Sequence, residues 1–418
     1  MIIRARLVLP MAGPPIEDGA IVIAGERIRS AGRWADAQPH AAGDVVDLGE
    51  VVLLPGLINA HCHLDYTGMG GKISPPRSFA DWIKAIVALK AEWSYTEFAD
   101  SWLRGAEMLL RSGTTTVADV EAVPELLPDM WQATPLRVIS FRELINLKNP
   151  ATAQQLVRET AEQWATLPNS RGGSTDARVG LSPHAPYTTS AELLSVAAHE
   201  ARKRKWLLTT HVAESEQETD MFMYRHGPLY DWLKSQRDMS DCGHGSPIHH
   251  LEKADYLGDN LLAVHVNYLW RDDAATLAKY GVSVVHCPRS HAYFRHLFFP
   301  RRELAGAGVN ICLGTDSLAS AAKARGKLPE LNMFTEMRTL QSKEPELAPQ
   351  TILELATVNA AKALKRDGEI GVLRKDALAD LIAVPFAGPA ESVHESLVQF
   401  EGAVRASMIG GQWAFGPN

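Results

Sequence analysis

The sequence predicts an α/β fold: a (β/α)8 TIM barrel with a small β-sandwich domain built from both chain ends. Two observations carry this prediction. From residue 51 onward, eight short apolar runs alternate with longer amphipathic stretches, and His or Asp residues stand at the ends of several runs. Parallel strands that are buried on both faces form continuous apolar runs. Barrel enzymes place their functional residues at the carboxyl ends of such strands.

Helical patterns separate the predicted strands. Apolar residues recur at helical spacing in FADWIKAIVALKAEW, SWLRGAEMLLRSG and AELLSVAAHEARKRK, and Gly113 provides a natural stop for the second of these. The strands are expected at 51–61, 115–120, 136–141, 177–184, 206–211, 261–265, 282–286 and 309–316.

Both ends of the chain carry short strand patterns with turn signals. In AIVIAGERIRSAG, Gly25-Glu26 fits a hairpin turn, and Gly410-Gly411 fits another in VRASMIGGQWAF. We therefore predict a composite β domain from residues 1–54 and 370–418, with the barrel at 55–369. A long excursion at 226–256, between the fifth and sixth strands, is expected to overhang the site.

Length and composition exclude several classes of protein. The chain has 418 residues, of which 46% are hydrophobic and 22% charged, which is typical of a large globular domain with a satellite. Its net charge of −7 gives no electrostatic reason to bind nucleic acid. No run approaches the roughly 18 apolar residues of a membrane span. The apolar stretch in MIIRARLVLPMAG is too short for a signal peptide.

Cysteine usage indicates a reducing compartment. The four cysteines form no C-x-x-C pair, and their spacing is typical of free thiols. We expect a cytoplasmic protein with no membrane or nucleic-acid partner, and leave open whether it forms a homo-oligomer. The cysteines are Cys62, Cys242, Cys287 and Cys312.

Histidine and aspartate at the strand ends predict a metal site. His61 and His63 project the same way from an extended strand, because side chains alternate with a period of two. His211 ends the fifth predicted strand and Asp316 the eighth. Such a nitrogen and oxygen shell suits zinc and leaves room for a water. We predict one divalent metal ion on these four residues, with zinc as first choice and iron or manganese as alternatives.

Several strings resemble one enzyme family. NAHCHLD, SPHAPYTTS, HVAESEQE, HVNYL, HCPRS and GTDSLAS are similar to the metal-dependent amidohydrolase superfamily. Within it they resemble the branch of cytosine, guanine and S-adenosylhomocysteine deaminases and triazine hydrolases. The similarity covers nearly the whole chain, including LNMFTEMRTL, TVNAAKAL and ALADLIAV. FADWIKAIV and HVAES also look similar to aminodeoxyfutalosine deaminases, which makes that nucleoside a candidate substrate.

The resemblance implies catalytic roles beside the metal ligands. It makes Glu214 the proton shuttle, and His265 a polarising group near the metal-bound water. Asp316 binds metal and also accepts a proton from that water. A Glu three residues beyond a metal-binding His stays beside the metal yet reaches the substrate ring, which suits general acid–base catalysis. His184 is implied to hydrogen-bond the substrate, with strand-end packing as the alternative.

Further substrate contacts are predicted with alternatives left open. The family parallel for Glu92 is a carboxylate that grips ribose hydroxyls, although its spacing from Trp82 is one residue off. A solvated helix carboxylate fits Glu92 equally well. Arg142 and Glu143 follow the third strand, where they could meet polar or anionic substrate groups or form surface salt bridges.

The string HCPRSHAYFRH departs from the family pattern. Nucleoside-type relatives commonly have Ser-Asn after the Pro, whereas this chain has Ser290-His291. We expect Ser290 to contact the substrate and recognition at this point to differ from those relatives.

Together these features predict a zinc-dependent aminohydrolase. It would deaminate an amino-substituted heterocycle, such as a purine base or an adenine-containing nucleoside, by attack of metal-bound hydroxide with proton transfer through Glu214. The implied partners are this small heterocycle and water. One alternative is an amidohydrolase that opens a cyclic amide or dechlorinates a heterocycle, and ammonia release separates the two. A non-catalytic scaffold on the same fold is a third reading, but it should have lost metal ligands that this chain retains.

Overall fold

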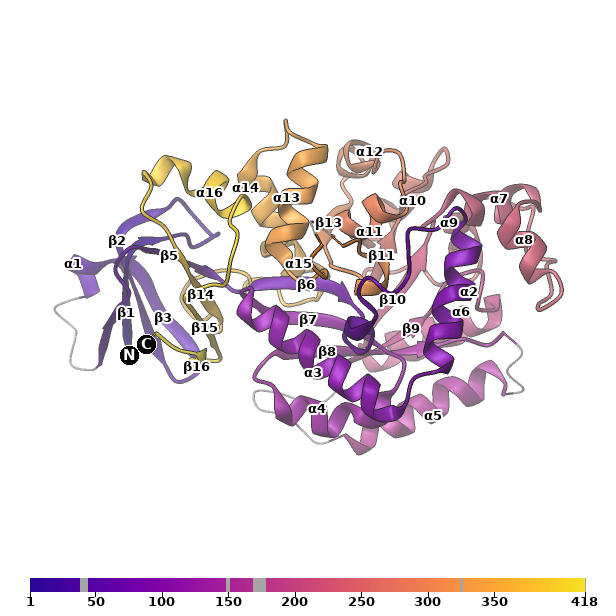
Figure 1. The fold of residues 1–418 in the computed structure, drawn as a ribbon, viewed down its shortest axis with the longest axis horizontal. Coiled ribbons are helices and arrows are strands. Elements are labelled where there is room, and N and C mark those ends of the chain that lie inside the picture. The colour runs from indigo at the N-terminus through magenta and orange to yellow at the C-terminus, as the bar shows by residue number, and fades with distance from the viewer. Residues whose placement is uncertain (38–43, 148–150, 168–177, 324–325, 418) are drawn as a thin grey trace.

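The chain folds into a large barrel with a smaller lobe attached to one side. This computed structural model describes residues 1–37, 44–147, 151–167, 178–323 and 326–417. Both chain ends lie in the smaller lobe, as Figure 1 shows. The predicted α/β barrel with a small domain from both ends is thereby confirmed.

Eight parallel strands form the barrel and follow one another in chain order around it. The last strand meets the first at their carboxyl ends, where Cys62 and Asp316 form an isolated parallel β-bridge. There the Asp316 N–H donates a hydrogen bond to the His61 carbonyl at 3.1 Å. This closure brings residues far apart in sequence to one mouth of the barrel. The strands are β6 (Leu57–Cys62), β7 (Thr114–Glu121), β8 (Arg137–Leu144), β9 (Val179–Pro183), β10 (Leu207–Val212), β11 (Leu261–His265), β12 (Ser283–His286) and β13 (Asn310–Leu313).

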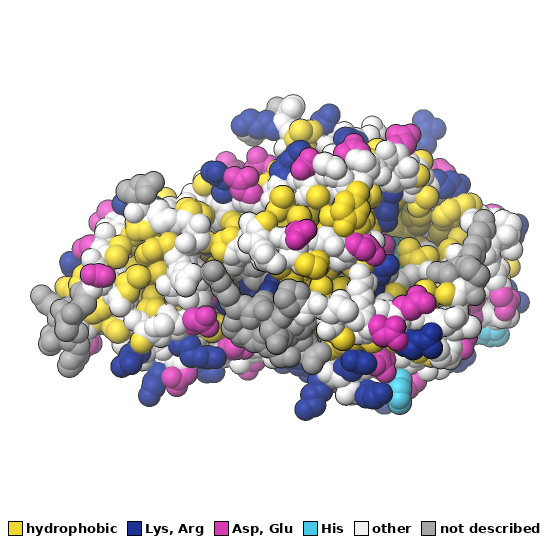
Figure 2. Space-filling view, turned by 90° about the horizontal axis from the view of Figure 1, so that it is seen from below, with side chains coloured by type: hydrophobic (Ala, Val, Ile, Leu, Met, Phe, Trp, Pro, Cys, Tyr) yellow, Lys and Arg dark blue, Asp and Glu magenta, His cyan; other side chains and the backbone are white. Residues whose placement is uncertain are grey.

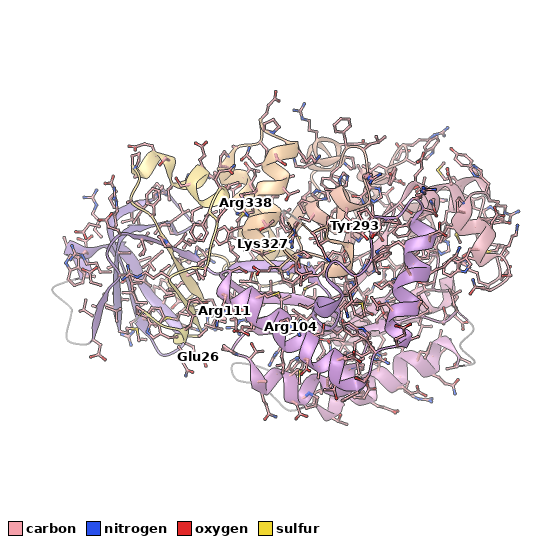
Figure 3. The ribbon with its side chains drawn as sticks, in the orientation of Figure 1. Glu26, Arg104, Arg111, Tyr293, Lys327 and Arg338 are labelled. Atoms are coloured by element: carbon pink, nitrogen blue, oxygen red, sulfur yellow. The ribbon has the colours of Figure 1, made fainter. Side chains whose placement is uncertain are left out.

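Helices cover the outside of the barrel. Helix α3 (Tyr95–Arg111) starts with a capping box, in which Ser94 and Glu97 each accept a hydrogen bond from the other's backbone N–H. It buries Trp102 against the strands, while its opposite face carries the exposed Arg104 and Arg111, labelled in Figure 3. This division follows from the helical spacing of its apolar residues.

The other helices connect or follow the barrel strands. The longer ones are α2 (Phe79–Ala91), α5 (Ala153–Thr166), α6 (Ala191–Arg204), α7 (Glu216–Tyr224) and α13 (Met333–Lys343). Shorter ones are α4 (Leu127–Ala133), α8 (Pro228–Leu233), α9 (Pro247–Lys253), α10 (Asp273–Lys279), α11 (Pro288–Tyr293), α12 (Arg301–Gly306), α14 (Pro349–Leu355), α15 (Val358–Ala363) and α16 (Val393–Val398). The 3-10 helices are η2 (Leu64–Met69), η3 (Pro124–Leu126), η5 (Leu318–Ser320) and η6 (Ala390–Ser392).

The small domain is one continuous mixed sheet around its own apolar core, ordered β16-β15-β14-β5-β1-β2-β3 with β4 paired to β1. The strands of the predicted β-sandwich domain thus form one continuously hydrogen-bonded sheet. The turns at Gly25-Glu26, with Glu26 labelled in Figure 3, and at Gly410-Gly411 join hairpin strands as predicted. The elements are β1 (Ile2–Val8), β2 (Ile16–Ala24), β3 (Arg27–Arg33), α1 (Trp34–Ala37), β4 (Val45–Asp47), β5 (Val51–Pro55), β14 (Leu381–Pro385), β15 (Ala406–Ile409) and β16 (Gln412–Phe415).

The expected single strand at 51–61 is wrong. The run divides at Gly56, so that β5 pairs with β1 and β14 in the small domain while β6 enters the barrel. A Cβ on Gly56 would lie 2.0 Å from the Thr115 hydroxyl oxygen, so glycine lets the chain pass between the two sheets. The apolar run continues across the division because both sheets bury it. The other seven strands lie close to their predicted positions, although Ala177 falls outside the described residues.

The excursion between β10 and β11 packs beside the mouth of the barrel. Leu229 and Leu233 of α8 share an apolar cluster with Phe79 of α2 and with Tyr187, which follows β9. The excursion and α2 therefore meet over the carboxyl ends of the strands. No helix in the described ranges has the length and apolarity to cross a membrane. On the face shown in Figure 2, basic and acidic side chains are interspersed.

Candidate metal centre and active site

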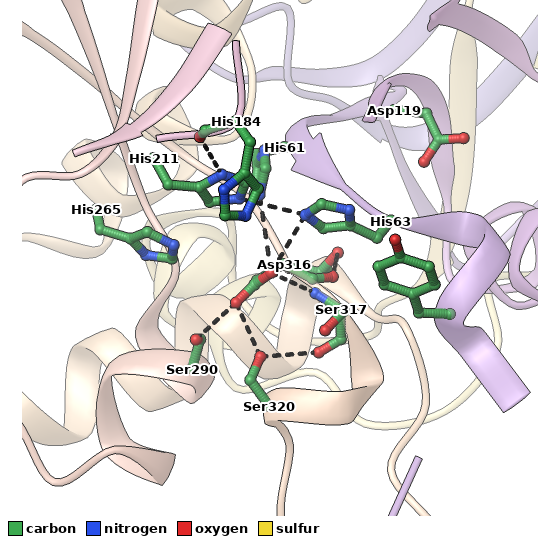
Figure 4. A network of polar contacts seen from close by, with 12 residues as sticks. His61, His63, Asp119, His184, His211, His265, Ser290, Asp316, Ser317 and Ser320 are labelled. Carbon is green, nitrogen blue, oxygen red and sulfur yellow. Dashed lines mark hydrogen bonds and ion pairs between the residues drawn. The ribbon is translucent and has the colours of Figure 1, made fainter. Parts of the chain in front are cut away.

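Three imidazoles and one carboxylate converge at the barrel mouth (Figure 4). Ligand atoms of His61, His63, His211 and Asp316 all lie within 4.8 Å of one another. His63 Nε2 is 3.3 Å from His211 Nε2, and Asp316 Oδ1 is 3.7 Å from His61 Nε2 and 3.8 Å from His63 Nε2. Two atoms that each bind one zinc ion at about 2.1 Å stand roughly 3.0–3.6 Å apart. The spacing fits one divalent ion with only small shifts.

The protonation states of the histidines in the cluster also suit a bound cation. His211 Nδ1 lies 2.8 Å from the His184 carbonyl oxygen, to which it can only donate, so that Nε2 keeps its lone pair in the neutral ring. Burial, followed by the charge of His61, lowers the pKa of His63 to about 3. His61 Nε2 is buried with no hydrogen-bond partner. Facing lone pairs at such distances repel one another unless a cation lies between them.

Three short contacts hold the carboxylate of Asp316 in place. Its Oδ2 accepts hydrogen bonds from Ser290 Oγ at 2.7 Å and from Ser320 Oγ at 2.8 Å, and its Oδ1 accepts from the Ser317 N–H at 2.6 Å. The Asp316 backbone has φ of +55°, a conformation that costs a non-glycine residue about 1–3 kcal/mol. The surroundings therefore fix both the backbone and the side chain of this residue.

Glu214 and His265 lie beside the four predicted metal ligands, close to Asp316. Glu214 follows β10 and His265 ends β11, and His265 Nε2 is 3.5 Å from Glu214 Oε1. Both can approach Asp316, because ligand atoms of these three residues lie within 4.8 Å of one another. Burial, followed by the charges of Asp316 and Glu218, raises the pKa of Glu214 well above its usual range. Burial lowers the pKa of His265 to about 3.

His184 lies beside the four predicted metal ligands. Its ring centroid is 4.9 Å from that of His211, and its Nδ1 is 2.7 Å from Thr188 Oγ1. Burial lowers the pKa of His184, so its ring is neutral at neutral pH. The residue combines a structural contact through its carbonyl with a ring at the edge of the site.

The other predicted substrate contacts are placed differently. Ser290 is buried behind Asp316 and donates to it. Arg142 Nη1 donates to the Ala122 carbonyl at 3.3 Å, on the opposite face of β8 from Glu143. Glu92 is exposed at the end of α2, and no hydrogen bond or ion pair within the described ranges joins it to the cluster. Their substrate contacts stay predictions.

Sequence reasoning missed several supporting side chains. Tyr66 stacks on His63 with centroids 5.2 Å apart and rings 6° from parallel. It follows His63 by three residues on a 3-10 turn, where positions three apart eclipse one another, so this contact had a readable signal. Glu218 accepts a hydrogen bond from the Glu214 N–H at 2.9 Å. Ser320 follows Asp316 by four residues in GTDSLAS.

Comparison with known proteins identifies the family. The model of the amidohydrolase family matches residues 52–414. The chain belongs to the amidohydrolase family. This amidohydrolase is a hydrolase that acts on C–N bonds, and its ligand cluster supports a divalent metal ion.

Three relatives are informative for this amidohydrolase. It is 31% identical, over 92% of its length and 83% of the relative's, to a 5-methylthioadenosine/S-adenosylhomocysteine deaminase of Syntrophobacter fumaroxidans. The structure of a Xanthomonas campestris adenosine deaminase with bound zinc matches with a TM-score of 0.82 at 25% identity, covering 99% of this chain and 92% of that one. The fold also matches Helicobacter pylori aminofutalosine deaminase, with a TM-score of 0.84 at 19% identity and 99% coverage of each chain.

Proposed function

We propose that this amidohydrolase uses zinc to deaminate an adenine-bearing nucleoside, with aminodeoxyfutalosine as one candidate. The reaction consumes water, replaces the ring amino group by oxygen and releases ammonia. Support comes from the relatives named as deaminases of such nucleosides and from the zinc in the Xanthomonas structure. His61, His63, His211 and Asp316 would hold the zinc. When bound, zinc lowers the pKa of a water and supplies a nucleophile at neutral pH.

The observation that carries the proposal is the position of Glu214 and His265 beside Asp316. Nucleophilic addition to the amino-bearing carbon needs a proton on the neighbouring ring nitrogen, and departure of ammonia needs another on the amine. The raised pKa of Glu214 lets its carboxyl group keep a proton until a base is placed against it. Glu214 gives its own proton to the ring nitrogen, and Asp316 takes one proton of the attacking water. The proton on Asp316 then goes to the departing amine, and Glu214 recovers a proton from the new hydroxyl group, which leaves the carbonyl product.

His265 serves the same reaction without changing its protonation. With a pKa of about 3 its imidazole is neutral, so it donates a hydrogen bond rather than a proton. Its Nε2 is buried with no hydrogen-bond partner, so a donor or acceptor remains available there. We infer that this atom stabilises the developing charge at the reacting carbon.

The proposal is tested by a substrate screen with zinc-loaded protein. Adenosine, 5-methylthioadenosine, S-adenosylhomocysteine and aminodeoxyfutalosine are compared with adenine, guanine and cytosine for ammonia release. We expect ammonia from at least one adenine nucleoside, with less from the free bases. Chloride from a chlorinated triazine, or ring opening of a cyclic amide, in the absence of ammonia from every nucleoside would contradict the proposal and favour the other hydrolase chemistry. No turnover of any compound would favour a scaffold.

A further inference from the structure

Glu143 stands at the mouth of the barrel, on the inner face of β8. Ile139 and Phe141 belong to the apolar cluster that fills the barrel, and Glu143 is the next residue on the same face because strand side chains alternate. The register pairs Glu143 with Ser182 of β9, so that His184 comes next on the inner face of the neighbouring strand. Glu143 therefore ends a row of interior side chains beside the predicted substrate contact.

The Glu143 carboxylate accepts no hydrogen bond from the residues that the structure describes. Its nearest charged neighbour is Lys90 of α2, whose Nζ is 3.7 Å from Glu143 Oε2, beyond hydrogen-bond distance. Lys90 donates instead to the Tyr66 hydroxyl, and its ammonium also lies 4.6 Å from the centroid of the Tyr66 ring. Within the described ranges, no group donates to either Glu143 oxygen, although the side chain is only 9% exposed.

This carboxylate is ionised at neutral pH. Burial alone would raise the pKa of Glu143, but the nearby Lys90 ammonium is the largest opposing cause, and the pKa falls to about 2. An ionised carboxylate in a buried position is costly unless donors satisfy its oxygens. Two carboxylate oxygens thus remain as strong acceptors toward whatever enters the mouth.

The charge balance at Glu143 indicates the kind of group it accepts. Lys90 already offsets the carboxylate charge, and a second cation placed against Glu143 would be repelled by the Lys90 ammonium. Neutral O–H donors meet no such repulsion, and a pair of adjacent hydroxyls can satisfy both oxygens. The arrangement favours a diol over an amine.

Position around the barrel supplies the second constraint. Glu143 lies near the carboxyl end of β8 and Glu214 follows β10, two strand spacings away or about 10 Å. A nucleoside whose reacting ring lies against Glu214 would extend past His184 toward Glu143. We propose that Glu143 is the residue that binds the ribose hydroxyls of the substrate and so selects ribosides. This inference rests on the proposed function and assigns to Glu143 the contact expected of Glu92.

The experiment compares three substrates on two proteins. Zinc-loaded wild type and Glu143→Gln are assayed with adenosine, 2′,3′-dideoxyadenosine and adenine. We expect wild type to prefer adenosine to the dideoxy compound by about 10- to 100-fold in kcat/KM, mainly through KM, because charge-assisted hydrogen bonds are lost. Glu143→Gln should reduce this preference to less than about threefold and lower adenosine turnover more than adenine turnover. Glu159→Gln, the same change at an exposed site on α5, should keep the wild-type preference.

Several results would overturn the inference. One is a wild-type protein that does not prefer adenosine to 2′,3′-dideoxyadenosine, and another is a Glu143→Gln variant that keeps this preference. A third is an equal loss of kcat/KM on all three substrates, which would indicate a structural role beside His63 and Tyr66. Tighter binding of 3′-amino-3′-deoxyadenosine than of adenosine would show that the site selects a cation. If Glu143→Gln misfolds by metal content or Tm, the wild-type comparison and Glu143→Asp, expected to lower the preference partially, decide the question.

A binding measurement separates this inference from the proposed function. Calorimetry on Glu214→Gln, with and without Glu143→Gln, measures the affinity ratio of adenosine to 2′,3′-dideoxyadenosine without turnover. Failure of every adenine nucleoside to release ammonia from wild type would contradict the proposed function alone. An affinity ratio near one in the Glu214→Gln protein would contradict the inference about Glu143.

Discussion

The hydroxyl of Ser290 lies 2.7 Å from Asp316 Oδ2 and holds a carboxylate that faces three imidazoles. Ser290 comes from α11 after β12, whereas Asp316 follows β13. The contact therefore ties together the last two strands of the barrel at the candidate metal centre. It also directs the Ser290 hydroxyl toward Asp316, whereas the sequence predicted a substrate contact.

Replacing Ser290 should weaken metal binding. Ser290→Ala removes one of two hydroxyl donors to Asp316 Oδ2, and loss of such an outer contact lowers metal affinity by about 10- to 100-fold. Competition with a zinc chelator measures the affinity. Ser320→Ala should behave similarly, and Ser342→Ala, on the exposed face of α13, should not. Unchanged zinc affinity with a raised KM would instead restore Ser290 as a substrate contact.

The cluster should bind one metal ion per chain. Four ligand residues form one group, and the second group in the described ranges, Glu214, His265 and Asp316, shares Asp316 with it. Elemental analysis after zinc loading should give one equivalent for wild type, and a large loss for His61→Ala and for His211→Ala. Two equivalents bound with equal affinity, or full zinc retention by either variant, would be inconsistent with this centre. Chelation should stop activity, and added zinc should restore it.

Strand number and the grouping of the four predicted metal ligands were readable from sequence because each depends on a local pattern. Apolar runs marked the strands, and His-X-His spacing placed two imidazoles together. The passage from β5 to β6 was missed because Val51 to Cys62 is buried throughout, leaving only Pro55-Gly56 as a cue. The domain boundaries, the cytoplasmic location and any oligomeric state stay predictions.

Substrate contacts were less predictable because they depend on side-chain direction across elements. Arg142 and Glu143 are adjacent in sequence, yet strand alternation sends one to the Ala122 carbonyl outside and the other to the barrel mouth. Glu92 fails to reach the cluster because the last turn of α2 directs Lys90 toward it instead. The element toward which such a side chain points cannot be derived from residue spacing within one segment.

Stability should fall with pH through Glu218. Burial raises the pKa of this carboxyl to about 8, partly offset by hydrogen bonds from the Glu214 and Ala213 N–H groups. The unfolded chain releases the proton near pH 4.3. Between these values only the folded state holds it, so the stabilising contribution is complete below about pH 4.3 and is lost as pH rises to about 8. Glu218→Gln resembles the protonated form, so its Tm relative to wild type should rise between pH 5 and 8.5.

The pH series needs a matched control. Glu125→Gln makes the same chemical change at an exposed position, and its Tm should follow the wild-type curve in parallel. Differential scanning calorimetry of the zinc-loaded proteins at equal ionic strength measures the three curves. A constant offset between Glu218→Gln and wild type across this range would show that Glu218 does not change protonation there.

The central claim is that Glu214 moves protons while other residues hold the metal, and Glu214→Gln tests it most directly. The change keeps the size of the side chain and the hydrogen bond between its N–H and Glu218. Ammonia release from the best nucleoside and zinc content are measured on the same sample. We predict full zinc content and turnover reduced by roughly two to four orders of magnitude. Near-normal ammonia release, or loss of zinc from a folded variant, would contradict the account.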